Sequence, residues 1–261
     1  MIDFKELAYA RVTKDHPLSG RLHPSSLSGC IRQEMYRFHG YTKTHRRSAW
    51  ECWMLDRFGW YEQAFRGIGL PSKQQFAVGN EMWSGRIDDL IEIPDGGMMI
   101  VDYKSISPWY KSKLPLLHNI PQIHAYVWLA ENMGMKVHSA VLVYIDRWDD
   151  SPEKNEPEPP KIRQYDVTPG AGDLQPVREL MDQFEHWARQ NGAGPGTAEL
   201  PDRPYGHPED HRWDCVAKQW KKWLRTKEWQ IRCPYFGHCW PEYVAQYTPV
   251  PDQDPDPDLP F

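Results

Sequence analysis

The stretch that decides the fold is Ser84-Gly-Arg-Ile-Asp-Asp-Leu-Ile-Glu-Ile-Pro-Asp-Gly-Gly-Met-Met-Ile-Val-Asp-Tyr-Lys104. Two apolar runs flank the turn sequence Pro-Asp-Gly-Gly, and this order is a strong signal for a β-hairpin. The first predicted strand carries Asp88, and the second ends in Asp102 and Lys104. Because side chains alternate between the two faces of a strand, Asp102 and Lys104 are predicted to share one face.

The two acids and the amine suit a metal-assisted reaction. Two carboxylates and an amine at strand ends can hold a divalent ion and activate a water, which is what the hydrolysis of a phosphodiester requires. The alternative is that Asp102 and Lys104 form an ordinary solvated ion pair. The run before them, 98–101, reads as buried on both faces, and a charge at the end of such a strand is costly unless it is paired or bound to a metal. This context favours the metal site.

The composition describes a soluble protein of one elaborated domain. The chain has 261 residues, contains no long apolar run, and has no charged-then-apolar leader, so we expect a cytoplasmic protein without a membrane partner. The net charge is −5, and four of the acids lie beyond Val250; without them the charge is −1, which is compatible with binding nucleic acid through local basic patches. The 13 tryptophans are expected in the core or stacked on unpaired bases.

Hydrophobic periodicity predicts an α/β domain in which helices alternate with few strands. In addition to the hairpin, we expect helices over 25–40, about 48–66, 122–133, 176–190 and 216–232, and strands over 74–78 and 140–145. A single domain is expected over 1–247, with its core at about 48–190. The segment 248–261 alternates Asp with Pro and is expected to be a disordered acidic tail.

A second pattern follows the hairpin. Gln122 and Tyr126 lie four residues apart, so both side chains occupy one face of a helix that begins 18 residues after Lys104. Alone, this pair would indicate an ordinary helix with a surface glutamine. Together with Gly85-x-x-Asp88 and Asp102-x-Lys104, it resembles the RecB-like members of the PD-(D/E)XK nuclease superfamily.

That resemblance implies a restriction-endonuclease-like core, with a small central mixed sheet flanked by helices. It implies that Asp88 and Asp102 bind Mg²⁺ or Mn²⁺, with the backbone carbonyl of Tyr103 as a further ligand. Lys104 would position and help deprotonate the attacking water, or stabilise charge on the phosphorane. Gln122 and Tyr126 would line the active site from the helix.

The first long helix departs from the family pattern. The family usually offers Gly-x-x-x-His there, and its His is another metal ligand, but Arg47-Ser-Ala-Trp-Glu51 occupies the place in this chain. Glu51 is a hard oxygen donor that suits Mg²⁺ or Mn²⁺ better than imidazole does. The alternatives are that Glu51 is an ordinary surface residue, or that Glu62 takes its part.

One early and three late cysteines form a third pattern: Cys30, Cys215, Cys233 and Cys239. Buried thiols are the commonest fate of cysteine, but sulfur ligands in this number suit zinc or an iron–sulfur cluster. The motif Ser25-x-Leu-x-x-Cys-x-Arg-x-x-x-Tyr36 resembles the CRISPR-associated and AddB-type exonucleases, in which such cysteines hold a [4Fe–4S] cluster. The resemblance implies a helical, cysteine-bound metal region, formed by 25–40 and 210–240, that joins the N- and C-terminal parts. The 17 residues between Cys215 and Cys233 exceed the usual family interval, so zinc or a three-cysteine site stays open.

The function that the resemblance implies is a metal-dependent DNA exonuclease, acting on single-stranded ends in recombination, repair or phage DNA processing. Two alternatives stay open. The chain could be a DNA-end-binding or trimming subunit of a larger complex, such as one for CRISPR spacer acquisition. It could also be a structure-specific endonuclease.

Two further segments suggest partners. Four basic residues lie close together in the predicted helix 216–232 and are candidates for contacts with DNA phosphates: Lys218, Lys221, Lys222 and Arg225. The alternative is that these side chains are solvated while the neighbouring tryptophans pack on the core. The terminal Asp-Leu-Pro-Phe261 is similar to the tip of bacterial single-stranded-DNA-binding proteins, which implies docking on a repair or replication protein. The alternatives are a solubilising tail and a tail that shields the basic DNA groove.

Overall fold

The computed structural model of this chain describes residues 20–45, 59–60, 62–67, 71–94, 96–106, 108–146, 161–190, 200–203, 216–218, 229–231 and 233–247. The chain forms two compact units. The sheet unit comprises Arg21–Ser28 and Arg57–His186, and the terminal unit comprises Met1–Gly20, Gly29–Asp56 and Trp187–Phe261.

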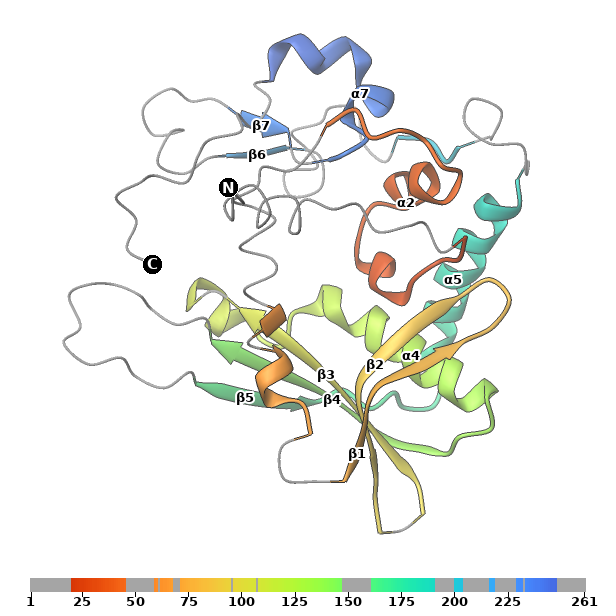
Figure 1. Cartoon of the computed structure of the whole chain (residues 1–261), viewed down its shortest axis with the longest axis vertical. Coiled ribbons are helices and arrows are strands. Elements are labelled where there is room, and N and C mark those ends of the chain that lie inside the picture. The colour runs from red at the N-terminus through yellow and green to blue at the C-terminus, as the bar shows by residue number, and fades with distance from the viewer. Residues whose placement is uncertain are drawn as a thin grey trace, which may run out of the picture. The chain divides into compact units, whose positions relative to one another are not determined.

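A five-stranded mixed sheet forms the centre of the sheet unit (Figure 1). In spatial order its strands are β1 (Ser72–Gly79), β2 (Ser84–Glu92), β3 (Met98–Ile106), β4 (Val137–Asp146) and β5 (Ile162–Asp166). Neighbouring strands are antiparallel except β3 and β4, which are parallel. A parallel pair needs a crossover connection, and the helix α4 (Ile120–Asn132) supplies it.

The predicted hairpin around Asp88 and Asp102 is confirmed as β2 and β3, which pair antiparallel. Four apolar residues between the two acids are buried and hold the hairpin in the core: Leu90, Ile91, Ile100 and Val101. Gly96 closes its turn with a φ of 77°, a conformation that glycine adopts without steric cost.

Helices flank the sheet and complete its core. The helix α4 contacts β1, β3 and β4, and most of its residues are buried. On α5 (Leu174–Arg189), Phe184 lies with its ring centroid 6.1 Å from that of Trp83. Short 3-10 helices complete the unit: η1 (Pro24–Ser28), η2 (Pro108–Lys113) and η3 (Leu117–Asn119). The α/β architecture that the sequence predicts, a small mixed sheet flanked by helices, is therefore present.

The terminal unit brings an early and a late segment of the chain together. Its described elements are α2 (Ile31–Phe38), β6 (Val216–Lys218), β7 (Trp229–Ile231), α7 (Phe236–Cys239) and η5 (Pro241–Gln246). The rings of Tyr36 and Tyr235 stack with their centroids 5.6 Å apart. The backbone N–H of Thr44 donates to the carbonyl of Pro234 at 2.8 Å. Aromatic packing and backbone hydrogen bonds thus join residues that are almost 200 positions apart in the sequence.

Most elements predicted for the sheet unit are confirmed, with longer bounds, and three predictions need correction. The helix predicted over 25–40 is two separate elements, η1 and α2, because the backbone is extended at Cys30. The strand β5 was not predicted, because the strand is only five residues long and none of its residues is buried. The helix predicted over 216–232 is wrong at both ends, where β6 and β7 pair antiparallel instead. Val216, Trp229 and Ile231 are β-branched or aromatic, and such residues fit a pleated surface better than a helix. Of the helix predicted over about 48–66, the structure describes 59–60 and 62–66; 59–60 and 62–65 are helical, and Arg66 lies in the turn that follows.

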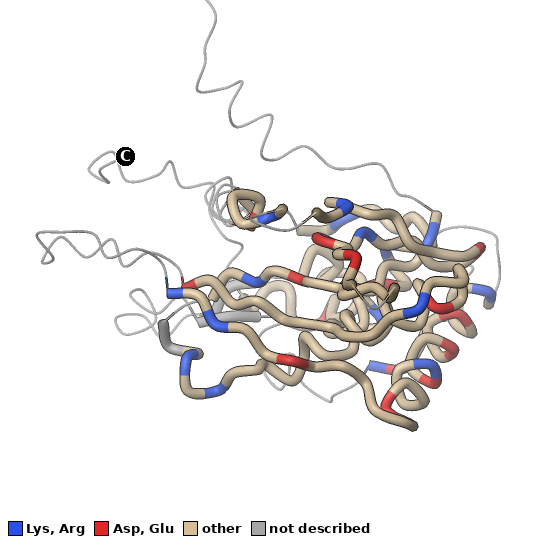
Figure 2. Tube along the Cα trace, turned by 90° about the horizontal axis from the view of Figure 1, so that it is seen from below, with Lys and Arg blue, Asp and Glu red and all other residues tan. Residues whose placement is uncertain are grey.

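The charges of the described residues are mixed rather than segregated. Figure 2 shows acidic and basic positions interspersed along the strands and helices. None of the helices in the described ranges combines the length and apolar character needed to cross a membrane.

Candidate active site

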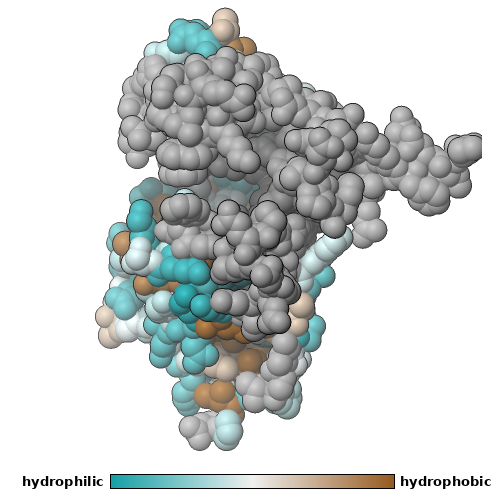
Figure 3. Space-filling model, turned by 90° about the vertical axis from the view of Figure 1, so that its left-hand side faces the viewer, coloured by the Kyte–Doolittle hydropathy of each residue, from teal (hydrophilic) through white to brown (hydrophobic). Residues whose placement is uncertain are grey.

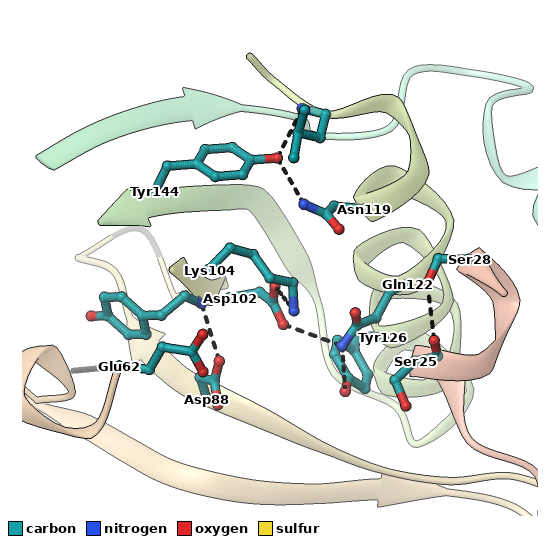
Figure 4. A network of polar contacts seen from close by, with 12 residues as sticks. Ser25, Ser28, Glu62, Asp88, Asp102, Lys104, Asn119, Gln122, Tyr126 and Tyr144 are labelled. Atoms are coloured by element: carbon teal, nitrogen blue, oxygen red, sulfur yellow. Dashed lines mark hydrogen bonds and ion pairs between the residues drawn. The ribbon is translucent and has the colours of Figure 1, made fainter. Parts of the chain in front are cut away.

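Two buried carboxylates face one another across the hairpin (Figure 4). Asp89 pairs with Val101, so the next step of the same antiparallel register places Asp88 opposite Asp102. Asp88 is 8% exposed and Asp102 is 2% exposed. Side chains at opposite positions have Cβ atoms about 5 Å apart, so two like charges share a buried space. Such an arrangement is unfavourable unless cations compensate it.

Lys104 supplies one of these cations. Its Nζ lies 2.7 Å from Asp102 Oδ2, which places both side chains on one face of β3 as the alternation predicts. Burial alone would lower the pKa of Lys104, but the adjacent Asp102 carboxylate outweighs burial, so the pKa is raised. Burial raises the pKa of Asp102, and Lys104 opposes this shift. The pair therefore keeps the proton on Lys104, while burial still disfavours the charged form of Asp102.

The helix α4 brings Gln122 and Tyr126 to the same place. Gln122 Nε2 donates to Asp102 Oδ1 at 3.4 Å and to the Tyr126 hydroxyl at 3.1 Å. Burial and the charge of Asp102 raise the pKa of Tyr126 to about 12. The glutamine thus connects α4 to Asp102 in the middle of β3, as Figure 4 shows.

Gly85 on β2 makes room for this helix. A Cβ at position 85 would lie 2.6 Å from Cε1 of Tyr126 and 3.1 Å from Cγ of Pro24, and the first of these distances is shorter than real Cβ contacts allow. The glycine that the sequence pattern singled out therefore permits Tyr126 to lie directly over the strand that carries Asp88.

A third carboxylate, that of Glu62, belongs to the same group. Its Oε1 accepts a hydrogen bond from the backbone N–H of Ser105 at 3.1 Å. Burial raises its pKa; the hydrogen bond from Ser105 and the charge of Lys104 oppose this shift, while Asp88 and Asp102 add to it. Glu51, the preferred third ligand from the sequence, lies outside the described residues. Glu62, the weaker candidate, is the one that the structure brings to the site.

Asp88 is held by residues that the sequence analysis missed. Arg66 Nη2 lies 2.6 Å from Asp88 Oδ1, and Gln75 Nε2 donates to the same oxygen at 2.9 Å. The backbone N–H of Tyr103 donates to Oδ2 at 3.0 Å. Arg66 follows Glu62 by four residues in a helical stretch, and this spacing could have indicated a shared face. No sequence signal indicates Gln75.

Asp89, the neighbour of Asp88, has different hydrogen-bond partners. It accepts hydrogen bonds from Gly67 N at 2.8 Å, from Ser72 Oγ at 2.9 Å and from the Tyr103 hydroxyl at 3.0 Å. Successive residues of a strand point to opposite faces, so Asp89 is turned away from Asp102. We interpret Asp89 as an anchor for the chain that enters β1.

The three carboxylates outnumber the two cations beside them, so the fully ionised site has a net formal charge of −1. The Asp102 Oδ2 atom is buried and, apart from the Lys104 ion pair, has no hydrogen-bond partner. Within the described part of the chain, no three His, Cys, Asp or Glu side chains converge tightly enough to form a complete metal site. The donor chemistry nevertheless suits a hard cation, because carboxylate oxygens are what Mg²⁺ and Mn²⁺ prefer.

The comparison with protein families agrees with this geometry. The family model described as the PD-(D/E)XK nuclease superfamily matches residues 7–225. The chain belongs to the PD-(D/E)XK nuclease superfamily. In this member, the candidates for the motif's Asp, second acid and Lys are Asp88, Asp102 and Lys104.

No curated protein matches the sequence of this superfamily member. Among solved structures it is similar to SSO0001, with 16% identity, a TM-score of 0.43, and coverage of 72% of this chain and 87% of that one. It is also similar to a phage-related exonuclease from Haemophilus somnus 129PT, with 13% identity, a TM-score of 0.41, and coverage of 64% and 93%. The alkaline exonuclease of Laribacter hongkongensis is 11% identical, with a TM-score of 0.37 and coverage of 70% and 96%.

The described cysteines lie in the terminal unit, and they do not form a metal site there. Cys233 and Cys239 are buried in its aromatic core, and Cys30 precedes α2. Burial raises the pKa of Cys239; Arg32 lowers that pKa and Cys30 raises it, so these side chains lie near one another. No group of three metal-ligating side chains occurs among the residues described, and Cys215 lies outside them.

The remaining candidates cannot be placed as sites. Lys218 lies in β6 rather than in a helix. The other basic candidates, Lys221, Lys222 and Arg225, and the tail ending in Phe261 lie outside the described residues.

Proposed function

We propose that this superfamily member is a metal-dependent DNA exonuclease that degrades single-stranded ends. The observation that carries the proposal is the buried pair Asp88 and Asp102, with Lys104 Nζ 2.7 Å from Asp102. An ion pair with no further role would gain little from such burial, because desolvating two like carboxylates costs several kcal/mol, on the order of the total stability of a domain. The contact from Gln122 to Asp102 supports the RecB-like assignment, and with it the exonuclease.

Mg²⁺ or Mn²⁺ is the cofactor that fits these residues. The net negative charge of the fully ionised site and its carboxylate oxygens both favour a hard cation. Asp88 and Asp102 would hold it, together with the Tyr103 carbonyl, and Glu62 is the nearest further candidate. When bound, such an ion supplies an activated water and a Lewis acid for the phosphoryl oxygen.

The protein side chains have separate tasks in the proposed reaction. Lys104 presents a cation beside Asp102, and its side chain is 24% exposed, so it can reach a phosphate oxygen and stabilise the charge that develops there. Gln122 orients Asp102 from α4. Arg66, together with the Tyr103 N–H, fixes the Asp88 carboxylate from the other side. Such supporting contacts typically contribute about 10–100-fold in metal affinity or activity.

The test is a cleavage time course on single-stranded DNA with a label at one end, beside a closed circular single strand of the same sequence. With Mg²⁺ or Mn²⁺, we expect the linear DNA to yield mononucleotides while the circle stays intact, and EDTA should stop the reaction. Cleavage of the circle, or discrete internal products, would instead indicate an endonuclease. Binding without any metal-dependent product would indicate a DNA-end-binding subunit. Either result contradicts the exonuclease.

We further propose that the cysteines bind a metal, either as a [4Fe–4S] cluster or as zinc, with Cys30, Cys215, Cys233 and Cys239 as ligands. Its support is the family resemblance and the proximity of Cys30 to Cys239 inside one compact unit. The arrangement of the described cysteines does not itself fit a completed site, so no step of the reaction is assigned to such a metal.

A further inference from the structure

A second charged group lies at the same ends of the strands as the candidate active site. Asp146 is the last residue of β4 and is 4% exposed. Its Oδ1 lies 2.7 Å from Arg163 Nη1, and its Oδ2 lies 3.0 Å from Lys111 Nζ. Each carboxylate oxygen thus meets a different cation, and the trio has a net formal charge of +1. The proposed hydrolysis assigns no task to it.

The exposure of the three side chains is unequal. The Asp146 side chain is 6% exposed, while those of Lys111 and Arg163 are 38% and 30% exposed. The acid is therefore the buried anchor, and the two cations extend from it toward solvent. An ammonium has three donors and a guanidinium has five, so each cation can contact the anchor and a ligand together. Lys113, on the same short helix η2 as Lys111, adds a further exposed basic residue.

The sheet register places Arg163 and Asp146 on the face of the candidate active site, and Lys111 reaches Asp146 from η2. Lys104 of β3 pairs with Tyr144 of β4, and Tyr144 pairs with Arg163 of β5. Directly paired residues point to the same face of a sheet, so Lys104, Tyr144 and Arg163 form one row across three strands. Tyr144, in the middle, is fully buried, and its hydroxyl accepts hydrogen bonds from Leu116 N and Asn119 Nδ2, both at 3.0 Å (Figure 4).

The spacing of the row suits a polyanion. Neighbouring strands lie about 4.8 Å apart, so the backbones of Lys104 and Arg163 are separated by about 10 Å, a distance that a short stretch of nucleic-acid backbone can span. In Figure 3 the described atoms of one face carry hydrophilic and hydrophobic patches side by side. It is the two partly exposed cations, Lys111 and Arg163, that favour a charged ligand over an apolar one.

We infer that Lys111 and Arg163, held by Asp146, form a phosphate-binding subsite for the DNA backbone a few nucleotides from the bond that is cut. The inference rests on the proposed nuclease function, because it requires that DNA lies along this face. Binding of a backbone phosphate here would fix the strand relative to Lys104 without reading its sequence.

The test is the salt dependence of DNA binding, measured by fluorescence anisotropy with a labelled single-stranded oligonucleotide in EDTA over a series of KCl concentrations. The slope of log K against log salt is negative, and a lost phosphate contact lowers its magnitude by about 0.7 for single strands. We expect Lys111→Gln to lower it by about 0.7, and Lys111→Gln with Arg163→Gln and Asp146→Asn to lower it by about 1.4. The triple variant avoids leaving a buried carboxylate without its cations, which would destabilise the fold.

Lys136→Gln is the matched control, because Lys136 is exposed and lies just before β4, at the end opposite to Asp146. Its slope should equal that of the wild type. Thermal unfolding of each variant checks that it is folded, and Lys111→Gln alone leaves the neutral Arg163–Asp146 pair in place. Folded Lys111→Gln and triple variants with the wild-type slope would overturn the subsite while leaving the nuclease intact. A wild-type protein that neither binds nor cuts DNA would instead reject the proposed function itself, and the subsite with it.

Discussion

Three donors hold Asp88, and one of them comes from an unusual backbone conformation. Gln75 has a φ of 51°, the single positive value of a non-glycine residue in the described chain. It lies in the middle of β1, and the register on either side places it opposite Asp88. A non-glycine residue in this region costs about 1–3 kcal/mol, and such strain is often found at functional sites. In this conformation the Gln75 side-chain amide donates a hydrogen bond to Asp88 at 2.9 Å.

Two substitutions separate the strain from the hydrogen bond. Gln75→Ala loses the hydrogen bond and keeps the backbone strain, whereas Gln75→Gly loses both. We therefore expect the unfolding free energy of the glycine variant to exceed that of the alanine variant by about 1 kcal/mol. Both variants should lose about 10–100-fold in nuclease activity, because Asp88 loses a positioning donor. Denaturant unfolding and the cleavage assay provide the two measurements. Equal unfolding free energies, or unchanged activity, would show that this conformation serves no such role.

Sequence reasoning reached the acids and the lysine because a hairpin turn and strand alternation are local patterns. It could not reach Gln75, since its role depends on a left-handed backbone that glutamine does not signal. It also could not assign Asp146, whose partners Lys111 and Arg163 are 35 and 17 residues away and become neighbours only when β5 pairs with β4.

At the scale of elements, the site depends on the helix α4 lying close to β2. Gly85→Ala would place a methyl group 2.6 Å from Tyr126 Cε1, so the ring must move and the Gln122 contact with it. Overpacking of this kind costs about 1–3 kcal/mol of unfolding free energy. We expect Gly85→Ala to be destabilised by about this amount and to lose activity as well.

A double-mutant cycle shows whether the clash with Tyr126 is the cause. Removing the ring with Tyr126→Ala should make the added methyl group less harmful, giving a coupling free energy of about 1 kcal/mol or more between the two positions. Additive effects on stability would place the cause elsewhere, for example at Pro24 on the other side of Gly85.

The elements that were predicted correctly carry a clear local signal. The helix α5 is amphipathic, and α4 and β4 are rich in buried apolar residues, whereas β5 is too short and too exposed to stand out. The pair β6 and β7 was misread as one helix because aromatic and basic residues recur there at spacings that also suit a helix. Pairing between distant strands decides such cases, and periodicity does not contain that information.

At the scale of the whole molecule, the terminal unit holds early and late segments together. Thr44 Oγ1 accepts the backbone N–H of Gly237 at 2.8 Å, and His238 Nε2 lies 2.8 Å from the carbonyl of Thr42. Closing so long a chain segment has a large entropy cost, and a metal bound by cysteines from both segments would offset part of it.

Elemental analysis and absorption spectra of protein purified without oxygen test the proposed cysteine site. We expect about four iron per chain and a brown colour for a cluster, or one zinc for the alternative. Cys239→Ser should then lose metal and unfold at a lower temperature. Protein without stoichiometric iron or zinc would rule out the metal and leave Cys239 as a buried thiol of the aromatic core.

The central claim is that the face of the hairpin with Asp88, and not the opposite face with Asp89, performs the chemistry. The two neighbours are both buried acids, so Asp88→Asn and Asp89→Asn form a matched pair. The deciding measurement is the Mg²⁺-dependent cleavage rate per folded molecule. We predict a loss of about 100-fold or more for Asp88→Asn. Asp89→Asn should keep the rate within a few-fold but lose about 1–3 kcal/mol of stability, because it disturbs buried hydrogen bonds. A wild-type rate for Asp88→Asn, or an equal loss of rate in both variants, would contradict the account.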